Sequence, residues 1–297
     1  MVHQRQQRTR QRTGVIRRRT GNRPDGDDAV AVRILSLHPL LDLAERPVVG
    51  HRGNAMHAPE NTLESFRQAI ELGVDAIEFD VHLTADGQPV VVHDPSVSRT
   101  TSGTGAVASM TASALAALDA GARFSPDGGR TFPWRERGIR VPLLRDVIEQ
   151  FPDTPLLIEI KTIAASAPTR RVIEEMGAAS RVVVAAGDVN AVAPFAGSHI
   201  ATAAAMAQIR RLLAPVLLRR PMGDLPYDTL CLPRSHRGVP LPLRAIASCV
   251  RAARVPVHVW TVNDASVAPV LWRAGIRGII SDDPGAMLRA RAMFGEG

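Results

Sequence analysis

The chain has 297 residues, of which 45% are hydrophobic, enough to build one large α/β domain. The formal net charge is +7, but residues 1–28 contribute +5 of it through eight arginines against three aspartates. The remaining residues are almost balanced, which argues against a basic nucleic-acid-binding or membrane-binding surface spread over the whole protein. Two cysteines are too few for a disulfide framework or a cysteine-based zinc site.

Residues 1–28 are polar, arginine-rich and without apolar periodicity, a composition typical of a disordered segment. We expect a solvated arm there in preference to an arm that binds polyanions. The first apolar run, residues 29–37, is interrupted by Arg33, so the chain lacks the hydrophobic region of a signal peptide. No run approaches the roughly 20 apolar residues of a spanning helix. The sequence therefore predicts a cytoplasmic protein, with no transmembrane segment, whose folded domain covers residues 29–297.

The folded part begins with a β-α-β pattern, the repeat of a parallel α/β fold. Residues 48–51 form an apolar run that predicts a buried strand. Asn61, Thr62 and Glu64 fit the start of a helix with a capping box, and Gly73 fits its end. Residues 76–81 then predict a second strand.

A short loop containing Asp86 and Gly87 joins the second strand to the apolar run 89–93. Such a loop normally indicates a hairpin, whereas a parallel crossover takes a dozen or more residues. We nevertheless expect a parallel strand with its helix missing, because that arrangement would bring His93 beside Glu78. Antiparallel pairing of residues 89–93 with the preceding strand is the alternative.

Residues 95–142 are rich in Ser, Thr, Gly and Pro, with one short helix expected at 112–120. A loop of this length usually has a function, so we interpret it as an insertion, or lid, over the site. Beyond it the pattern alternates between helices and strands. Helices are expected at 143–151, 169–176, 205–219 and 243–254, and strands at 155–161, 181–186, 199–203, 229–232, 257–262 and 278–281. These make nine strand candidates in all.

Three carboxylates alternate with apolar residues on predicted strands. Glu78 and Asp80 are two residues apart, so they share one face of their strand. Glu159 interrupts the apolar strand 155–161 in the same way. Carboxylates that converge at one strand mouth would repel one another unless a hard cation lay between them. The pattern predicts a Mg²⁺ or Ca²⁺ site, and the alternative for each residue alone is a surface carboxylate at a strand end.

Two histidines, His51 and His93, end apolar strand runs. Imidazoles beside a hard cation suggest acid/base chemistry on an oxygen-rich substrate such as a phosphate ester. The alternative is a strand-end histidine bonded to the backbone. Arg52 follows His51, and Lys161 is the single lysine among 36 basic residues, so both are candidate phosphate-binding residues. Trp260 ends a strand and could form a wall of the substrate site, with core packing as its alternative.

Seven segments in chain order resemble the glycerophosphodiester phosphodiesterase family: HRG, PENT, EFDVHLTADG, PVVVHD, LLIEIK, VHVWTVND and GIISDDP. The likeness runs from about residue 46 to about residue 290 and is weakest in the middle of the chain. It implies a single (βα)8 TIM barrel with an insertion after the third strand. The nine strand candidates exceed the eight barrel positions by one, and we expect the surplus strand in the weakly patterned middle.

The resemblance also implies hydrolysis of glycerophosphodiesters to glycerol 3-phosphate and an alcohol with a divalent cation. The nucleophile is water or the substrate's own hydroxyl. A lysophospholipase D-like activity on lysolipids and an inactive barrel that binds a phosphate ligand are the alternatives, and no nucleic-acid partner is expected. The expected site comprises catalytic His51 and His93, substrate-binding Arg52, Lys161 and Trp260, and metal-binding Glu78, Asp80 and Glu159.

Overall fold

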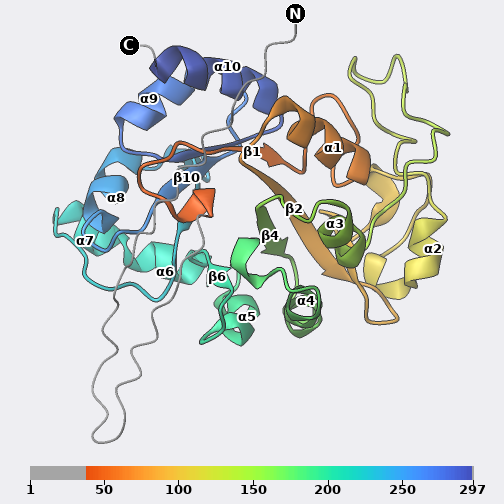
Figure 1. Cartoon of the computed structure of the whole chain (residues 1–297), viewed down its shortest axis with the longest axis horizontal. Coiled ribbons are helices and arrows are strands. Elements are labelled where there is room, and N and C mark those ends of the chain that lie inside the picture. The colour runs from red at the N-terminus through yellow and green to blue at the C-terminus, as the bar shows by residue number, and fades with distance from the viewer. Residues whose placement is uncertain (1–37, 296–297) are drawn as a thin grey trace, which may run out of the picture. The chain divides into compact units, whose positions relative to one another are not determined.

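The computed structural model describes residues 38–295 (Figure 1). Eight parallel strands form its centre. The neighbouring order is β6-β5-β4-β2-β1-β11-β10-β7, and a parallel bridge between Ala203 and Thr229 joins the two ends. These pairings confirm the predicted (βα)8 barrel. The strands are β1 (Val48–His51), β2 (Ala76–Leu83), β4 (Leu156–Ile160), β5 (Val182–Ala186), β6 (Ala201–Thr202), β7 (Leu230–Pro233), β10 (Val257–Trp260) and β11 (Gly278–Ser281).

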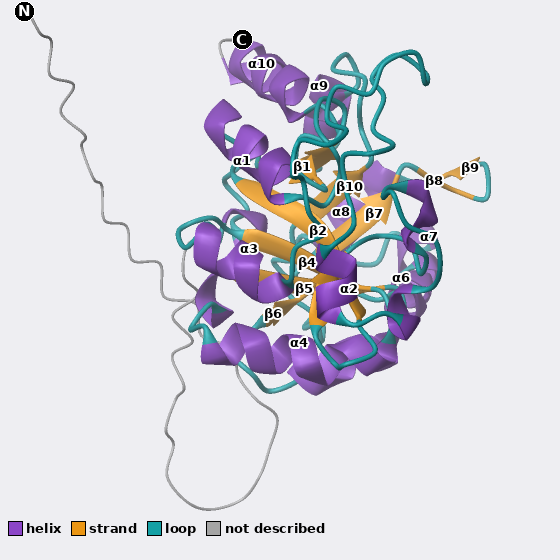
Figure 2. Cartoon of the chain, turned by 90° about the vertical axis from the view of Figure 1, so that its right-hand side faces the viewer, coloured by secondary structure: helices purple, strands orange, loops and turns teal. Residues whose placement is uncertain are grey.

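Helices surround these strands (Figure 2). The α-helices are α1 (Leu63–Leu72), α2 (Ala112–Ala116), α3 (Leu144–Gln150), α4 (Ile163–Glu175), α5 (Val189–Val192), α6 (Met206–Arg211), α7 (Leu213–Leu217), α8 (Leu243–Val250), α9 (Ala268–Arg273) and α10 (Pro284–Gly295). Short 3-10 helices are η1 (Pro39–Leu41), η2 (Val97–Arg99), η3 (Val107–Ser109), η4 (Ala179–Arg181) and η5 (Ala193–Phe195), and β8 (Ser235–His236) and β9 (Val239–Pro240) form a hairpin. No helix within residues 38–295 is long and apolar enough to cross a membrane.

Several helix boundaries differ from the prediction. Helix α4 begins six residues before its expected start. It contains Pro168, and proline normally interrupts a helix, so the local sequence indicated a later start. The expected helix 205–219 is divided at Leu212 into α6 and α7. At α1, Thr62 does cap the helix by accepting from the amide of Ser65, and Gly73 ends it, but Glu64 bonds to Arg67 rather than completing a capping box.

The strand at residues 89–93 is antiparallel, so the expected parallel strand with a missing helix is wrong. Strand β3 (Pro89–Val91) pairs with the end of β2, Val81 opposite Val91 and Leu83 opposite Pro89. The loop between them is too short for a crossover, and Gly87 takes the positive φ of 77° that its tight turn requires. The surplus strand is therefore β3, not one in the middle of the chain. The hairpin still brings the residues before His93 back to the end of β2, because Val92 N–H donates to the carbonyl of Asp80.

The alternation of β2 separates two environments. Ile77, Phe79 and Val81 belong to the core between the sheet and its helices. Ala76 belongs to a second cluster, inside the barrel, that also contains Leu40, Val49, Leu157, Val183 and Ile280. Since alternate residues share a face, Glu78 and Asp80 continue the interior face beyond this apolar floor. The interior is thus apolar at one end and acidic at the other.

The insertion after β3 has a small core of its own. Val92, Val97, Val107, Leu115 and Val141 are buried together, and β3 contributes Val90 to the cluster. A backbone bridge between Ser96 and Ala106 closes its first turn. The segment is therefore packed against the end of the β2–β3 hairpin. The described residues belong to one compact unit, and the predicted disordered arm, residues 1–28, lies outside them.

Candidate active site

The three carboxylates predicted to bind metal lie together. Glu78 and Asp80 come from the end of β2, and Glu159 from the adjacent β4, where the register places it opposite Asp80. One oxygen of each lies within 4.8 Å of the other two. Glu78 and Asp80 are buried, whereas the Glu159 side chain is 37% exposed. A set of hard oxygen donors open to solvent on one side fits Mg²⁺ or Ca²⁺.

The pKa values of two of these acids are shifted in opposite directions. Burial raises the pKa of Glu78 to about 8, with a further contribution from the nearby charge of Asp80. Burial alone would also raise the pKa of Asp80, but Lys161 and Arg52 outweigh it and hold that pKa below its ordinary value. A bound divalent cation would offset both the burial of the Glu78 carboxylate and its repulsion by Asp80, and so lower this pKa.

The neighbouring thiol is not one of the clustered donors. Cys231 lies on β7, and burial raises its pKa to about 12, helped by the charges of Glu78 and Glu159. The donor atoms that lie within 4.8 Å of one another are all carboxylate oxygens, whereas zinc sites usually contain nitrogen or sulfur ligands.

Three side chains hold Asp80, two through ion pairs and one through an amide hydrogen bond. Lys161 Nζ lies 2.7 Å from Asp80 Oδ1 and also 3.0 Å from Glu159 Oε2. Arg52 Nε lies 3.2 Å from Asp80 Oδ2, and Asn61 Nδ2 donates to the same oxygen at 2.9 Å. Burial lowers the pKa of Lys161, but Asp80 and Glu159 outweigh it, so the ammonium stays charged. The only lysine in the sequence is therefore part of this cluster.

Backbone geometry in the HRG segment aims Arg52 at the same site. Arg52 has a left-handed φ of 53°, and its backbone N–H donates to Glu78 Oε2 at 3.0 Å. Gly53 follows with a φ of 92°, and a Cβ on it would stand 2.4 Å from Ser65 Oγ. Only glycine fits this contact with α1, which explains the residue after Arg52.

His51 is oriented by an acid from the other end of the sequence. Its Nδ1 lies 2.6 Å from Asp282 Oδ1, and its Nε2 lies 3.9 Å from Glu78 Oε2. Burial lowers the pKa of His51, but Glu78 and Asp282 outweigh burial and raise it overall. Asp282 is itself held by Asn263, whose Nδ2 donates to Oδ2 at 2.7 Å. The free Nε2 of His51 therefore faces the acidic cluster.

His93 has a comparable partner. Its Nδ1 lies 2.6 Å from Oδ1 of Asp94, and Arg99 Nε lies 2.6 Å from the other oxygen of that acid. Arg99 also forms two 2.7 Å bonds to Glu60, which in turn lies 2.8 Å from Arg52 Nη1. A continuous series of ion pairs thus connects the neighbour of His93 to the Arg52 side chain.

The residues that support these groups were not predicted as site residues. Asn61 was interpreted as part of a helix start, yet it bonds Asp80. Glu60, the preceding residue in PENT, pairs with two arginines. The sequence did contain signals for two of these supporting residues, since Asp94 directly follows His93 and GIISDDP contains Asp282. What no local pattern indicates is which distant side chain each one meets.

Trp260 and two further histidines, His258 and His82, take no part in the side-chain pairs described above. Trp260, the last residue of β10, is 40% exposed at the strand end. His258, two residues earlier, is fully buried, and its Nε2 lies 2.9 Å from the carbonyl of Leu40 in the apolar floor. Gly278 on β11 makes room for this ring, because a Cβ there would stand 2.2 Å from His258 Nδ1. His82 bonds the carbonyl of His93.

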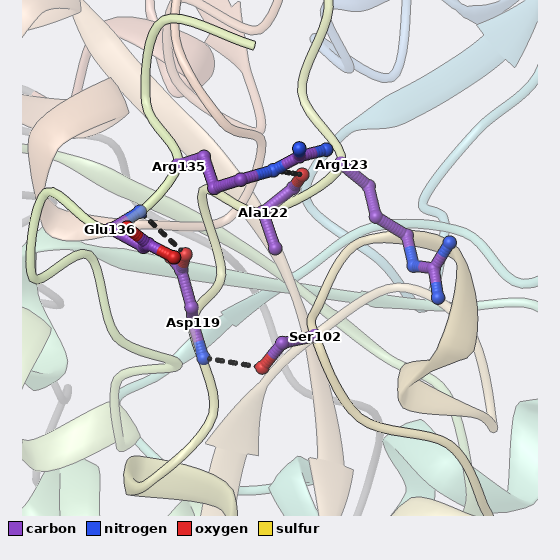
Figure 3. A pocket seen from close by; sticks show the side chains of 6 residues that line it. All are labelled: Ser102, Asp119, Ala122, Arg123, Arg135 and Glu136. Carbon is purple, nitrogen blue, oxygen red and sulfur yellow. Dashed lines mark hydrogen bonds between the residues drawn. The ribbon is translucent and has the colours of Figure 1, made fainter.

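The insertion contains a separate pocket of about 450 Å³ (Figure 3). Asp119 lines this pocket, and its carboxylate accepts hydrogen bonds from the backbone amides of Gly121 and Glu136. The pocket contains none of the predicted site residues. Its lining is Ser102, Asp119, Ala122, Arg123, Arg135 and Glu136.

Comparison with known proteins gives concordant results. Residues 51–286 match the model of the glycerophosphoryl diester phosphodiesterase family. A glycerophosphodiester phosphodiesterase from Caldanaerobacter subterraneus subsp. tengcongensis is 31% identical over 251 residues, which cover 81% of this chain and 96% of the relative.

Solved structures share the fold. The glycerophosphoryl diester phosphodiesterase domain of an uncharacterized Mycobacterium tuberculosis protein aligns with a TM-score of 0.74 and 22% identity, covering 83% of this chain and 99% of that one. A phosphodiesterase from Oleispira antarctica, solved in complex with the product sn-glycerol-3-phosphate, aligns with a TM-score of 0.65 and 24% identity, covering 84% and 98%. Because the family model spans most of its length, this chain belongs to the glycerophosphoryl diester phosphodiesterase family, whose named members are phosphoric diester hydrolases.

Proposed function

We propose that this protein hydrolyses glycerophosphodiesters to glycerol 3-phosphate and an alcohol, and that it does so with a divalent cation. The observation that carries the proposal is the group of three carboxylates whose oxygens lie within 4.8 Å of one another, next to Lys161 and Arg52. The fold neighbour from Oleispira antarctica, which holds sn-glycerol-3-phosphate, supports the choice of product.

Glu78, Asp80 and Glu159 would hold the cation, which when bound polarises the phosphoryl group and offsets the charge of the transition state. Arg52 and Lys161 bring two positive charges to the same mouth. Both already pair with Asp80, so their ends are fixed before substrate arrives. They bind the non-bridging oxygens of the phosphodiester and hold its phosphorus in line for attack.

The two imidazoles transfer protons. In each ring Nδ1 is engaged by a carboxylate, Asp282 for His51 and Asp94 for His93, so Nε2 is the atom left for proton transfer. One Nε2 accepts the proton of the attacking oxygen as that oxygen bonds to phosphorus. The other donates a proton to the alcohol oxygen as its bond to phosphorus breaks. The attacking oxygen belongs to water or to the substrate's own hydroxyl, which would first form a cyclic phosphate.

The direct test is release of glycerol 3-phosphate from glycerophosphocholine and glycerophosphoethanolamine, with and without a chelator. We expect turnover that the chelator removes and that added Mg²⁺ or Ca²⁺ restores. Lysophosphatidylcholine in a parallel reaction tests the lysophospholipase D-like alternative. Binding of glycerol 3-phosphate without turnover of any of these substrates would support the inactive binding module instead.

A further inference from the structure

Helix α7 presents an apolar face outward as well as one inward. Leu212 and Val216 are 2% and 4% exposed and pack in the core beside β7 and α8. Leu217 and Leu218, by contrast, are 81% and 62% exposed, and Leu213, one turn before Leu217, is 43% exposed. Figures 1 and 2 both place α7 at the outer edge of the barrel unit. Large aliphatic side chains adjacent on one exposed helix usually mark a contact surface.

Two pairs of arginines flank these leucines. Arg210 and Arg211 end α6, Arg219 and Arg220 follow α7, and all four are exposed. The stretch 206–223 contains no aspartate or glutamate. None of the four arginines forms an ion pair with a residue in the described range 38–295, whereas arginines on other outer helices, Arg67 and Arg145 among them, do.

We propose that residues 210–220, here called the α7 surface, dock this protein on an anionic lipid bilayer. An interfacial helix buries its apolar face at the boundary of the acyl chains while basic residues meet the lipid phosphates. Long arginine side chains can also reach the head groups while the leucines enter the boundary. This docking goes beyond the proposed reaction and does not depend on it.

The residue types favour a bilayer over the other polyanions and over self-association. A nucleic acid would pair with the arginines but leave three leucines in contact with phosphate and water. A symmetric contact between two copies would place arginines against arginines, with no acid in the stretch to neutralise them. An anionic bilayer boundary satisfies both kinds of side chain.

The test is flotation of the full chain with vesicles of phosphatidylcholine alone or of phosphatidylcholine with phosphatidylglycerol. We expect binding only to the anionic vesicles, weakened as the salt rises from about 0.1 M to about 0.5 M. R219Q/R220Q should weaken it by about fivefold for each arginine. L217S/L218S should weaken it by at least about tenfold, because two aliphatic side chains lose their apolar contact. V270S, an exposed valine on α9, is the matched apolar control and should bind as the parent does.

The arginines of residues 1–28 provide a competing source of binding, and the leucine variant separates the two. Anionic binding that L217S/L218S leaves unchanged would come from that segment and would overturn the proposal. The proposal would also be overturned if L217S/L218S changed a dimer to a monomer, as measured by light scattering, without any loss of vesicle binding. Turnover of soluble glycerophosphocholine should be the same in parent, L217S/L218S and R219Q/R220Q, since these residues lie outside the site. An inactive parent would contradict the proposed reaction but leave the flotation result intact.

Discussion

Nδ1 of His51 lies 2.6 Å from Oδ1 of Asp282, although 231 residues separate them in the chain. The contact exists because β1 and β11 are parallel neighbours, with Gly50 opposite Ser281, so each strand delivers its next residue to the same rim. The last strand of the barrel thus orients a side chain of the first.

Replacing Asp282 should therefore impair turnover without affecting metal binding. D282N keeps the shape but removes the carboxylate charge that stabilises the protonated His51 ring, which is needed whether His51 accepts or donates the proton. We expect kcat to fall on the order of 10²-fold, with unchanged calorimetric affinity for Mg²⁺ or Ca²⁺. D264N, at an exposed acid bonded to Ser266, is the control. Equal kcat in D282N and D264N would refute the orienting role.

The histidine pair can be tested directly. H51A or H93A removes one proton-transfer group and should lower kcat on the order of 10²-fold or more. Titration of the cation by calorimetry should still show binding in both variants, because neither histidine is one of the three carboxylate ligands. Retained turnover in both variants would remove the acid/base assignment.

Arg99 should act as a positioning residue, because it holds both Asp94, the partner of His93, and Glu60, the partner of Arg52. R99A should lower kcat by roughly tenfold to a hundredfold, and change KM less, since the groups it releases are misplaced rather than removed. R99K keeps the charge without the planar fork that spans two carboxylates, so it should recover only part of the loss. R67A is a matched control, since Arg67 is similarly exposed and also pairs with two acids, Glu64 and Glu71. An R99A enzyme as active as R67A would contradict this role.

Loss of one carboxylate should weaken the cation site. E159Q retains an oxygen at the position but removes its charge, so the affinity for Mg²⁺ or Ca²⁺ should fall at least about tenfold. E78A should abolish cation-dependent turnover. E149Q, at an exposed acid on α3, controls for net charge. Unchanged isotherms for E159Q and E78A would mean that the cation binds elsewhere.

The apolar floor should make stability depend on pH. Burial lowers the pKa of His258 to about 4, and His38 behaves in the same way, so both are neutral in the folded state. Between pH 6.5 and 4 the unfolded chain binds these protons and the folded chain does not, so stability falls as the pH falls through that window. H258Q keeps a donor for the carbonyl of Leu40 and should flatten the slope by about 1.4 kcal/mol per pH unit. Urea unfolding at several pH values measures the free energy of unfolding of the parent, of H258Q and of the exposed control H57Q. Equal pH slopes in the parent and H258Q would exclude His258 as a cause.

Much of the fold could be read from local patterns. Apolar runs located every barrel strand, and Thr62 and Gly73 marked the ends of α1 correctly. The spacing of Glu78 and Asp80 placed both on one strand face, because side-chain alternation is a property of the strand itself. The Asp86-Gly87 loop also indicated the hairpin that the structure contains, and the error came from setting aside this local signal in favour of an expected position for His93.

What the sequence by itself determined was the kind of side chain at each strand end: an imidazole at His51, a carboxylate at Asp80, an ammonium at Lys161. Only the tertiary structure decided which of them meet. The pairings of His51 with Asp282 and of Arg99 with Glu60 join residues far apart in the chain, through barrel closure and the packing of the insertion. Strand alternation is set by neighbouring residues, whereas contacts across a rim depend on the register of strands that no single segment encodes.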